Sequence, residues 1–253
     1  MLAVAVTAGP AESADLNLLP HRAIYSVKLG AARTGSSVTA IRGAMVFELV
    51  KTCESWTLQQ RARFEMSDTD GDTVQNEVNF TSWESADGKA YGFSLRSLRD
   101  GEIAEDVRGK ARLEDDGSGE AIYSVPELRS VELPAGTQFP ITHTAALIAA
   151  GLNNQRQLTV PLFLGEREDE PLMVHAVITG RVGSADPADP LRADLPWRVH
   201  MAFHATGDAA LPAFEMVQTL YASGLVSEVT VQYEDFSMIY VLERAEPLPR
   251  PGC

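Results

Sequence analysis

Apolar and polar side chains alternate with a period of two along much of this chain, and that pattern restricts the fold more than any other feature. On one face of an extended segment the alternation places Trp56, Leu58, Ala62, Phe64 and Met66. The odd-numbered positions from 57 to 65 carry only polar or charged side chains. A second segment repeats the pattern with Trp197, Val199, Met201 and Phe203. Such alternation is typical of β-strands with one buried face, so the sequence predicts an all-β fold.

Asp-Gly pairs punctuate the first half of the chain at similar intervals. They occur at Asp70-Gly71, Asp87-Gly88, Asp100-Gly101 and Asp116-Gly117. This dipeptide adopts the positive φ angles that tight hairpins require. We therefore expect residues 55–125 to form an antiparallel meander, and the alternating runs of the whole chain to give about 14 strands.

One segment departs from the strand pattern and predicts a short helix over residues 142–151. Its body is rich in alanine, Thr142 is a candidate N-cap, and Gly151 stands where a helix commonly ends. Pro140, just ahead of it, suits a chain that enters from a loop.

Residues 1–14 resemble the remnant of an export signal. An apolar run from Leu2 to Ala8 is followed by small residues, and we expect cleavage after Ser13 or Ala14. No lysine or arginine precedes Arg22, so the charged start of a signal is missing. The alternative is the N-terminal tail of a cytosolic protein. No stretch of 18 or more apolar residues predicts a transmembrane segment.

The chain contains two cysteines, Cys53 and Cys253. In an oxidising compartment two remaining cysteines pair more often than they stay free, so we expect a disulfide between them and a location outside the cytoplasm. The alternative is two unrelated buried thiols. The segment at 184–190 is rich in Pro and Asp, which predicts an exposed loop. Because the bridge would span this loop, we interpret residues 15–253 as one domain.

Charge and motifs exclude several classes of function. A formal charge of −14 and a pI near 4.7 disfavour nucleic acids and anionic lipid surfaces as partners. The serine-hydrolase, zinc-protease, phosphate-loop and dinucleotide-binding motifs are all absent from the sequence.

The candidate metal ligands fail on spacing. The run Asp68–Asp72 departs from a calcium loop in the position of its glycine and is better explained as a hairpin tip. His200 and His204 share one predicted strand, where four residues span roughly 13 Å, too far to share an ion. We therefore predict no metal ligand, no cofactor and no catalytic residue. The alternative is a hydrolase whose catalytic residues lie far apart in the sequence and are brought together by folding.

Five segments follow one another along the chain: His21–Tyr25 after Pro20, Gly43 to Phe47 leading to Cys53 and Trp56, Glu84–Gly88, Leu133–Pro140, and Tyr233–Phe236 with the segment running on to Cys253. In this order they resemble the EipB family of periplasmic cell-envelope integrity proteins of alphaproteobacteria. The resemblance implies a β-spiral, a broken antiparallel sheet of about 14 strands curled into a half barrel. It also implies a disulfide that maps onto Cys53 and Cys253, a role in envelope integrity under stress, and no enzymatic activity. The implied shape is similar to that of lipoprotein carriers.

Two functions follow as the leading hypotheses. The first is a noncatalytic scaffold or binding module that acts with an envelope protein. The second is a carrier of a lipid or lipoprotein acyl chain on the concave face of the sheet. The candidate lining residues are Trp56, Phe64, Trp197 and Phe203, and the alternative for them is a packed core without a ligand. The sequence identifies no ligand, partner or oligomeric state.

Overall fold

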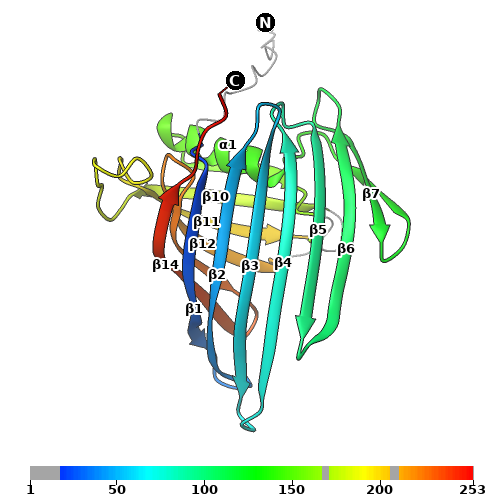
Figure 1. The fold of residues 1–253 in the computed structure, drawn as a ribbon, viewed down its shortest axis with the longest axis vertical. Coiled ribbons are helices and arrows are strands. Elements are labelled where there is room, and N and C mark those ends of the chain that lie inside the picture. The colour runs from blue at the N-terminus through cyan, green and yellow to red at the C-terminus, as the bar shows by residue number, and fades with distance from the viewer. Residues whose placement is uncertain (1–17, 167–170, 206–210, 253) are drawn as a thin grey trace, which may run out of the picture.

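A single curled sheet dominates the computed structural model, which describes residues 18–166, 171–205 and 211–252. Fourteen antiparallel strands are joined edge to edge in that sheet, which does not close into a barrel, and one helix accompanies it in the described ranges (Figure 1). The elements are β1 (His21–Ala32), β2 (Val38–Lys51), β3 (Ser55–Asp68), β4 (Thr73–Ser85), β5 (Ala90–Arg99), β6 (Glu102–Leu113), β7 (Gly119–Val125), β8 (Arg129–Leu133), α1 (Pro140–Leu152), β9 (Gln157–Leu162), β10 (Leu172–Arg181), β11 (Trp197–His204), β12 (Phe214–Leu220), β13 (Val226–Gln232) and β14 (Phe236–Pro247). The predicted all-β spiral is confirmed.

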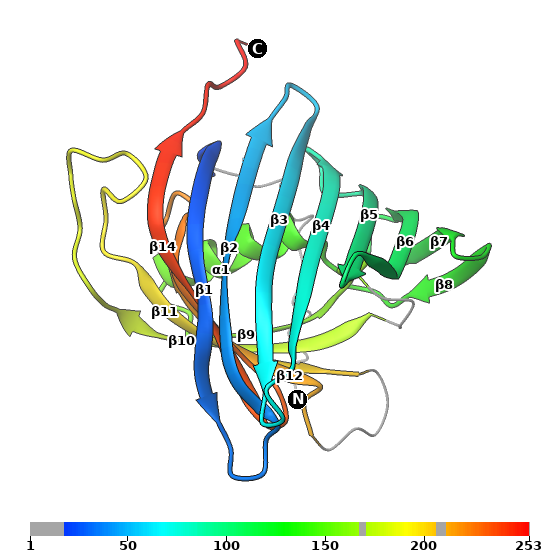
Figure 2. The same cartoon turned by 60° about the horizontal axis from the view of Figure 1, so that its bottom comes forward.

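The first and last strands lie side by side in the middle of the sheet. Its strand order is β8-β7-β6-β5-β4-β3-β2-β1-β14-β13-β12-β11-β10-β9. Because β1 pairs with both β2 and β14, the two halves of the chain extend the sheet in opposite directions and curl toward each other (Figure 2). Near the two edges of the sheet, a parallel bridge joins Gln138, in the segment after β8, to Leu162 of β9.

The predicted meander over residues 55–125 is confirmed, since β3 to β7 pair in sequence from Ser55 to Val125. All four Asp-Gly pairs lie between consecutive strands of this meander. In the β5–β6 turn both residues adopt positive φ, 51° at Asp100 and 83° at Gly101. This is the left-handed geometry of a two-residue hairpin, and glycine adopts it at little cost.

The main hydrophobic core lies on the concave, inner face of the sheet, and aromatic rings form its densest part. Tyr91, Phe93, Tyr123, Phe139 and Phe163 are all buried and contact one another. The rings of Tyr91 and Phe139 stack with centroids 4.7 Å apart, and the Tyr91 hydroxyl donates a 2.7 Å hydrogen bond to the Leu164 carbonyl. Phe139 precedes α1 and Phe163 follows β9. The cluster therefore connects β5 and β7 to the chain before α1 and after β9, and it joins the two halves of the spiral.

The predicted helix exists, but it begins earlier than expected and Thr142 does not cap it. Its N-cap is Phe139, which makes no side-chain capping hydrogen bond, and Pro140 is the first helical residue. Gly151 lies inside the helix and Asn153 is the C-cap. The Thr142 hydroxyl instead hydrogen-bonds to Glu84 of β4, a contact between residues far apart in sequence.

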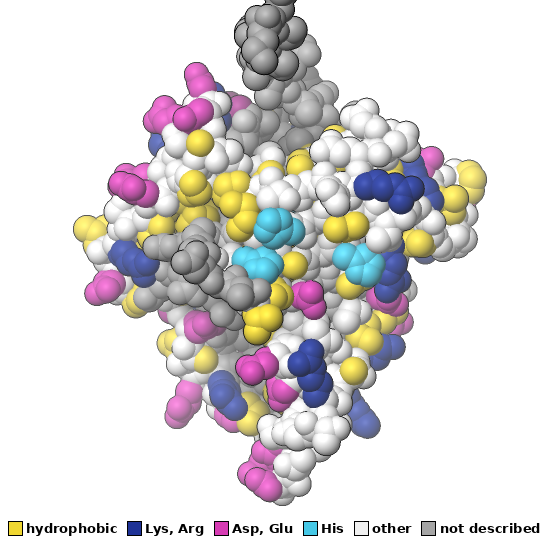
Figure 3. Space-filling view, turned by 180° about the vertical axis from the view of Figure 1, so that it is seen from behind, with side chains coloured by type: hydrophobic (Ala, Val, Ile, Leu, Met, Phe, Trp, Pro, Cys, Tyr) yellow, Lys and Arg dark blue, Asp and Glu magenta, His cyan; other side chains and the backbone are white. Residues whose placement is uncertain are grey.

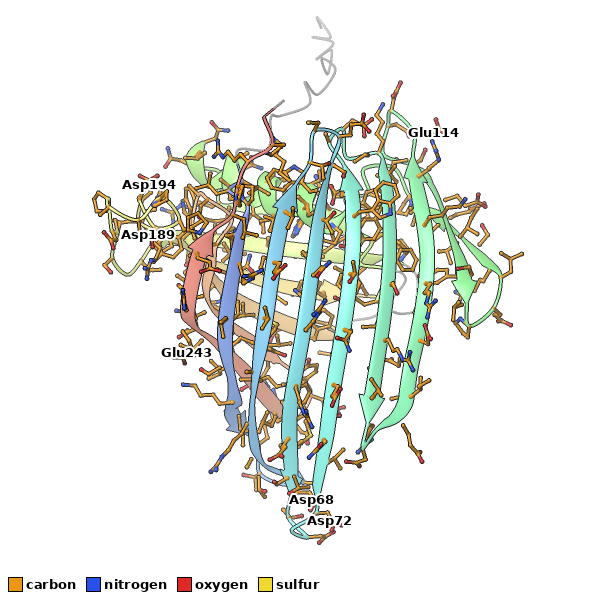
Figure 4. All side chains as sticks on the ribbon, viewed as in Figure 1. Asp68, Asp72, Glu114, Asp189, Asp194 and Glu243 are labelled. Carbon is orange, nitrogen blue, oxygen red and sulfur yellow. The ribbon has the colours of Figure 1, made fainter. Side chains whose placement is uncertain are left out.

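The Pro- and Asp-rich loop between β10 and β11 is exposed at residues 184–188, as the sequence predicts, and it is anchored to the sheet further along. Leu191 is buried in a small cluster with Ala23, Tyr25, Tyr221 and Leu225. Asp189 and Asp194 lie at the periphery of the molecule (Figure 4). The strands on both sides of this loop belong to the same sheet.

Candidate functional site

Helix α1 is docked onto the sheet by one buried carboxylate. Glu84 accepts hydrogen bonds of 2.9 Å from the backbone N–H groups of Ile141 and Thr142, and a third from the Thr142 hydroxyl. The first N–H groups of a helix have no partner inside the helix, and the positive end of its dipole favours a carboxylate. Glu84, on the inner face of β4, therefore binds the free N–H groups at the start of the helix, a role for which the sequence suggested Thr142.

Burial changes the protonation of this carboxyl group. Glu84 is fully buried, and desolvation raises its pKa to about 7, although the hydrogen bonds from Thr142 and Ile141 act in the opposite direction. Nearby on the helix, burial lowers the pKa of His143 to about 4, so this ring is neutral at physiological pH. Perturbed groups of this kind often mark active sites. Here both side chains are buried, and Glu84 lies in the contact between helix and sheet.

Three of the four predicted lining residues belong to the packed core. Trp56, Trp197 and Phe203 are at most 4% exposed and lie in the main core cluster, together with Ile141, Leu147, Ile148 and Ala150 of α1. We call the end of the spiral that carries α1 the helix end (Figure 1). The helix packs against the inner face there, and this part of the face is filled by protein side chains.

The opposite half of the inner face has a different character. Many of its apolar side chains remain only half-buried, among them Met45, Phe64, Met66, Val78, Met216 and Tyr240. We call these six residues the tip-side inner face, after the β3–β4 hairpin, whose tip carries Asp68 and Asp72 (Figure 4). The cross-strand pairs place two of them on the inner face, since Tyr240 stands opposite buried Val27 and Met216 opposite buried Met201.

Phe64 is the predicted lining residue that lies on this surface. Its side chain packs with Met45, Met66 and Tyr240 against a small cluster built on Val27, Val38, Ile41 and Met238. The structure thus separates Phe64 from the two tryptophans, which the sequence grouped with it. Period-two alternation shows which face a residue occupies but not how deeply that face is covered.

The outer face of the same strands is polar. Arg22 of β1 forms ion pairs with Glu48 of β2 at 2.5 Å and with Glu246 of β14 at 3.2 Å. A shallow hollow of about 80 Å³ on this face is lined by Val46, Glu48, Gln59 and Arg61. The contrast with the methionine and aromatic side chains opposite makes the tip-side inner face the better candidate for binding an apolar group.

Cys53 lies in the exposed turn between β2 and β3, at the helix end. Cys253 lies outside the described residues, as does the predicted signal remnant at residues 1–14. Across the described ranges no cysteine is free. The Cys53–Cys253 disulfide stays a prediction.

The histidines divide between the core and the outer surface. His21 and His143 are buried, whereas His175, His200 and His204 lie on the outer face of β10 and β11. The partner of His204 is His175, whose ring centroid is 5.3 Å away, and sequence spacing could not reveal this cross-strand pair. Within the described residues no group of three or more His, Cys, Asp or Glu side chains is placed to hold a metal.

The Asp68–Asp72 run forms a hairpin tip, as expected. The Asp68 carboxylate accepts hydrogen bonds from the backbone N–H groups of Asp70 and Asp72, at 3.0 and 2.9 Å. The aspartate oxygens therefore stabilise the turn itself.

Comparison with known proteins shows the family. A model described as EipB-like matches residues 12–249. The chain belongs to the EipB-like family. It is 30% identical over 243 residues to the cell envelope integrity protein EipB of Brucella abortus (strain 2308), covering 91% of this chain and 85% of that one. The resemblance stated from sequence segments is confirmed, and with it a function related to the cell envelope.

A solved structure supports the fold independently. The chain is similar to the crystal structure of a beta-barrel-like protein of a domain of unknown function from Brucella abortus, with a TM-score of 0.84 and 28% identity. The similarity covers 92% of this chain and 99% of the other. No helix in the described part of this EipB-like protein is long and apolar enough to cross a bilayer.

Proposed function

We propose that this protein supports cell-envelope integrity from the periplasm as a noncatalytic binding module, and that the tip-side inner face is its binding surface. Family membership supports the link to the envelope. The observation that carries the binding role is the half-buried state of Phe64, Met66 and their neighbours on a face whose other half is fully packed. Methionine and aromatic side chains suit such a surface, because methionine adapts its shape to different apolar partners.

The described geometry supports the predicted disulfide and, with it, an oxidising compartment. Leu49 of β2 and Pro247 of β14 flank His21 on its two sides, so they lie roughly 10 Å apart. Both strands run to the helix end, where a 2.8 Å hydrogen bond from Leu248 to Pro20 holds the last segment against the sheet. The residues after Pro247 span up to roughly 20 Å, which is enough to reach Cys53.

The absence of catalysis is part of the proposal. Burial raises the pKa of Glu84 to about 7 and lowers that of His143 to about 4, and both side chains are buried, one against the start of α1 and the other on the helix itself. A substrate could not reach either side chain without undocking the helix. A screen of envelope substrates tests this point, and turnover that a His143→Ala variant loses while it stays folded would contradict it.

A deletion strain tests the envelope role, and pull-down from crosslinked envelopes tests for a protein partner. We expect the deletion to increase sensitivity to detergents or other envelope stress, and the tagged protein to recover the same partner repeatedly. A Phe64→Glu variant should lose this partner, whereas Glu65→Gln on the opposite face should keep it. An intact envelope in the deletion strain together with no specific partner would contradict the proposal.

A second candidate, carriage of a lipid or lipoprotein acyl chain, is favoured by the same apolar surface. Native mass spectrometry of protein purified without detergent would show a bound lipid, or uptake of an added one. Phe64→Glu should abolish the lipid-bound species and Glu65→Gln should preserve it. Protein that is empty and ignores added lipid would exclude carriage and leave the protein-binding module.

A further inference from the structure

Two imidazole rings meet on the outer face of the C-terminal half of the sheet. His175 lies on β10 and His204 on β11, and the register places His175 opposite Ala202 and His204 opposite Met173. The two histidines are therefore diagonal neighbours on one face. Their ring centroids lie 5.3 Å apart at an interplanar angle of 81°. Two histidine side chains lie next to each other on this side of the molecule (Figure 3).

A threonine on the next strand holds one of these rings. Thr159 of β9 stands opposite His175, and its hydroxyl oxygen lies 3.1 Å from the Nδ1 atom of the ring. When Nδ1 carries the proton and donates it to this oxygen, the lone pair is left on Nε2. A hydrogen bond to one ring nitrogen that leaves the other free is the usual arrangement of a metal-binding histidine.

We propose that His175 and His204 form a solvent-open, two-imidazole site for a borderline divalent transition-metal ion, with Cu²⁺ the preferred ion. Neutral imidazole is a common ligand of copper, zinc and nickel, and affinity in this series is highest for copper. Ligand distances of about 2 Å from each nitrogen to the ion require the two rings to converge, which rings this close achieve by side-chain rotation. Water fills the remaining positions, so the ion exchanges readily.

The surroundings favour a cation at this pair. Glu215 of β12 stands opposite Ala202 and adds a carboxylate to the same face. The whole chain carries a formal charge of −14, which raises the local concentration of cations. The site lies on the outer surface of the sheet and is independent of the tip-side inner face, so it goes beyond the proposed binding function.

His200 provides a matched control. It lies on β11 with its side chain on the same outer face as His204, opposite Val177 and Val217. Four residues along a strand separate it from His204 by roughly 13 Å. An imidazole at this position can bind an ion only on its own.

The test is titration of the mature protein with Cu²⁺ at pH 7.5, followed by calorimetry and by electron paramagnetic resonance. We expect one ion per chain, with hyperfine structure from two nitrogen ligands. His175→Ala and His204→Ala should each weaken binding at least about tenfold, because each leaves a single imidazole. Thr159→Val should weaken it less, and His200→Ala should leave it unchanged.

Two results would overturn the proposal. One is wild-type affinity in the double variant His175→Ala/His204→Ala, which would place the ion elsewhere. The other is an equal loss of affinity in His200→Ala, which would show scattered binding to surface histidines. Both ligand residues have accessible side chains, so the variants should fold, and circular dichroism checks that they do.

Discussion

Glu84 has two effects that oppose each other. Its carboxyl group satisfies the N–H groups of Ile141 and Thr142 that start α1, yet it does so in a fully buried position. Burial of a charge is costly, so the protonated form is favoured and the pKa rises to about 7. Near neutral pH the helix contact is therefore held by a group that is close to changing its charge.

The pH dependence of stability should reveal this residue. The folded protein keeps the Glu84 proton up to a pH of about 7, whereas the unfolded chain releases it near 4.5. At this group the folded state thus binds more protons, and the contribution of Glu84 to the free energy of unfolding should fall by roughly 3 kcal/mol as the pH rises through this window. His143, with a folded pKa of about 4, contributes an increase over part of the same range, so the effect of Glu84 is measured as a difference between variant and wild type.

Urea unfolding of Glu84→Gln between pH 4.5 and 7.5 measures the effect. The variant lacks the Glu84 contribution, so its stability relative to the wild type should increase with pH across this range. Glu54→Gln, in the exposed β2–β3 turn, is the control and should keep the wild-type dependence. If the free energy of unfolding of Glu84→Gln depends on pH as that of the wild type does, Glu84 does not contribute to this dependence.

At the scale of elements, the close packing of α1 against β11 depends on a glycine. A Cβ atom at Gly151 would lie 2.6 Å from Cε2 of Trp197, whose indole is itself buried. Glycine inside a helix costs about 1 kcal/mol relative to alanine, so propensity alone would make Gly151→Ala stabilising. The close contact with Trp197 should make Gly151→Ala destabilising instead.

We expect Gly151→Ala to lower the free energy of unfolding by about 1–3 kcal/mol through overpacking. Ala149→Gly, on the exposed side of the same turn, should cost about 1 kcal/mol through propensity alone. Thermal unfolding of both variants separates the two effects. Stabilisation by Gly151→Ala would mean that Trp197 moves aside and that the helix is not held at this distance.

The elements show what the sequence could and could not predict. Alternation and Asp-Gly turns predicted the meander of β3 to β7, because both signals are local. The start of α1 was misplaced because its capping group, Glu84, lies on a strand far away in sequence. The His175–His204 pair was missed for the same reason. The alternation also placed Trp56 and Phe64 on one face, but the packing of α1 over only one end decides which of them is covered.

For the whole molecule, the predicted disulfide would join the C-terminal segment to the β2–β3 turn. Closing a loop of about 200 residues stabilises a fold by roughly 5 kcal/mol on the chain-entropy model. Cys53→Ser should therefore lower the melting temperature of the oxidised protein, and reductant should lower that of the wild type to a similar value. A wild-type melting temperature that does not respond to reductant would contradict the bridge.

The tip-side inner face is tested most directly by photocrosslinking in living envelopes. A benzophenone amino acid at Phe64 faces this surface, and the same probe at Glu65 faces outward from the next position of the same strand. The proposed function predicts a specific adduct from position 64 and none from position 65. A protein adduct would identify a binding module, and a lipid adduct a carrier. Equal labelling at both positions, or none at position 64, would contradict binding by this face.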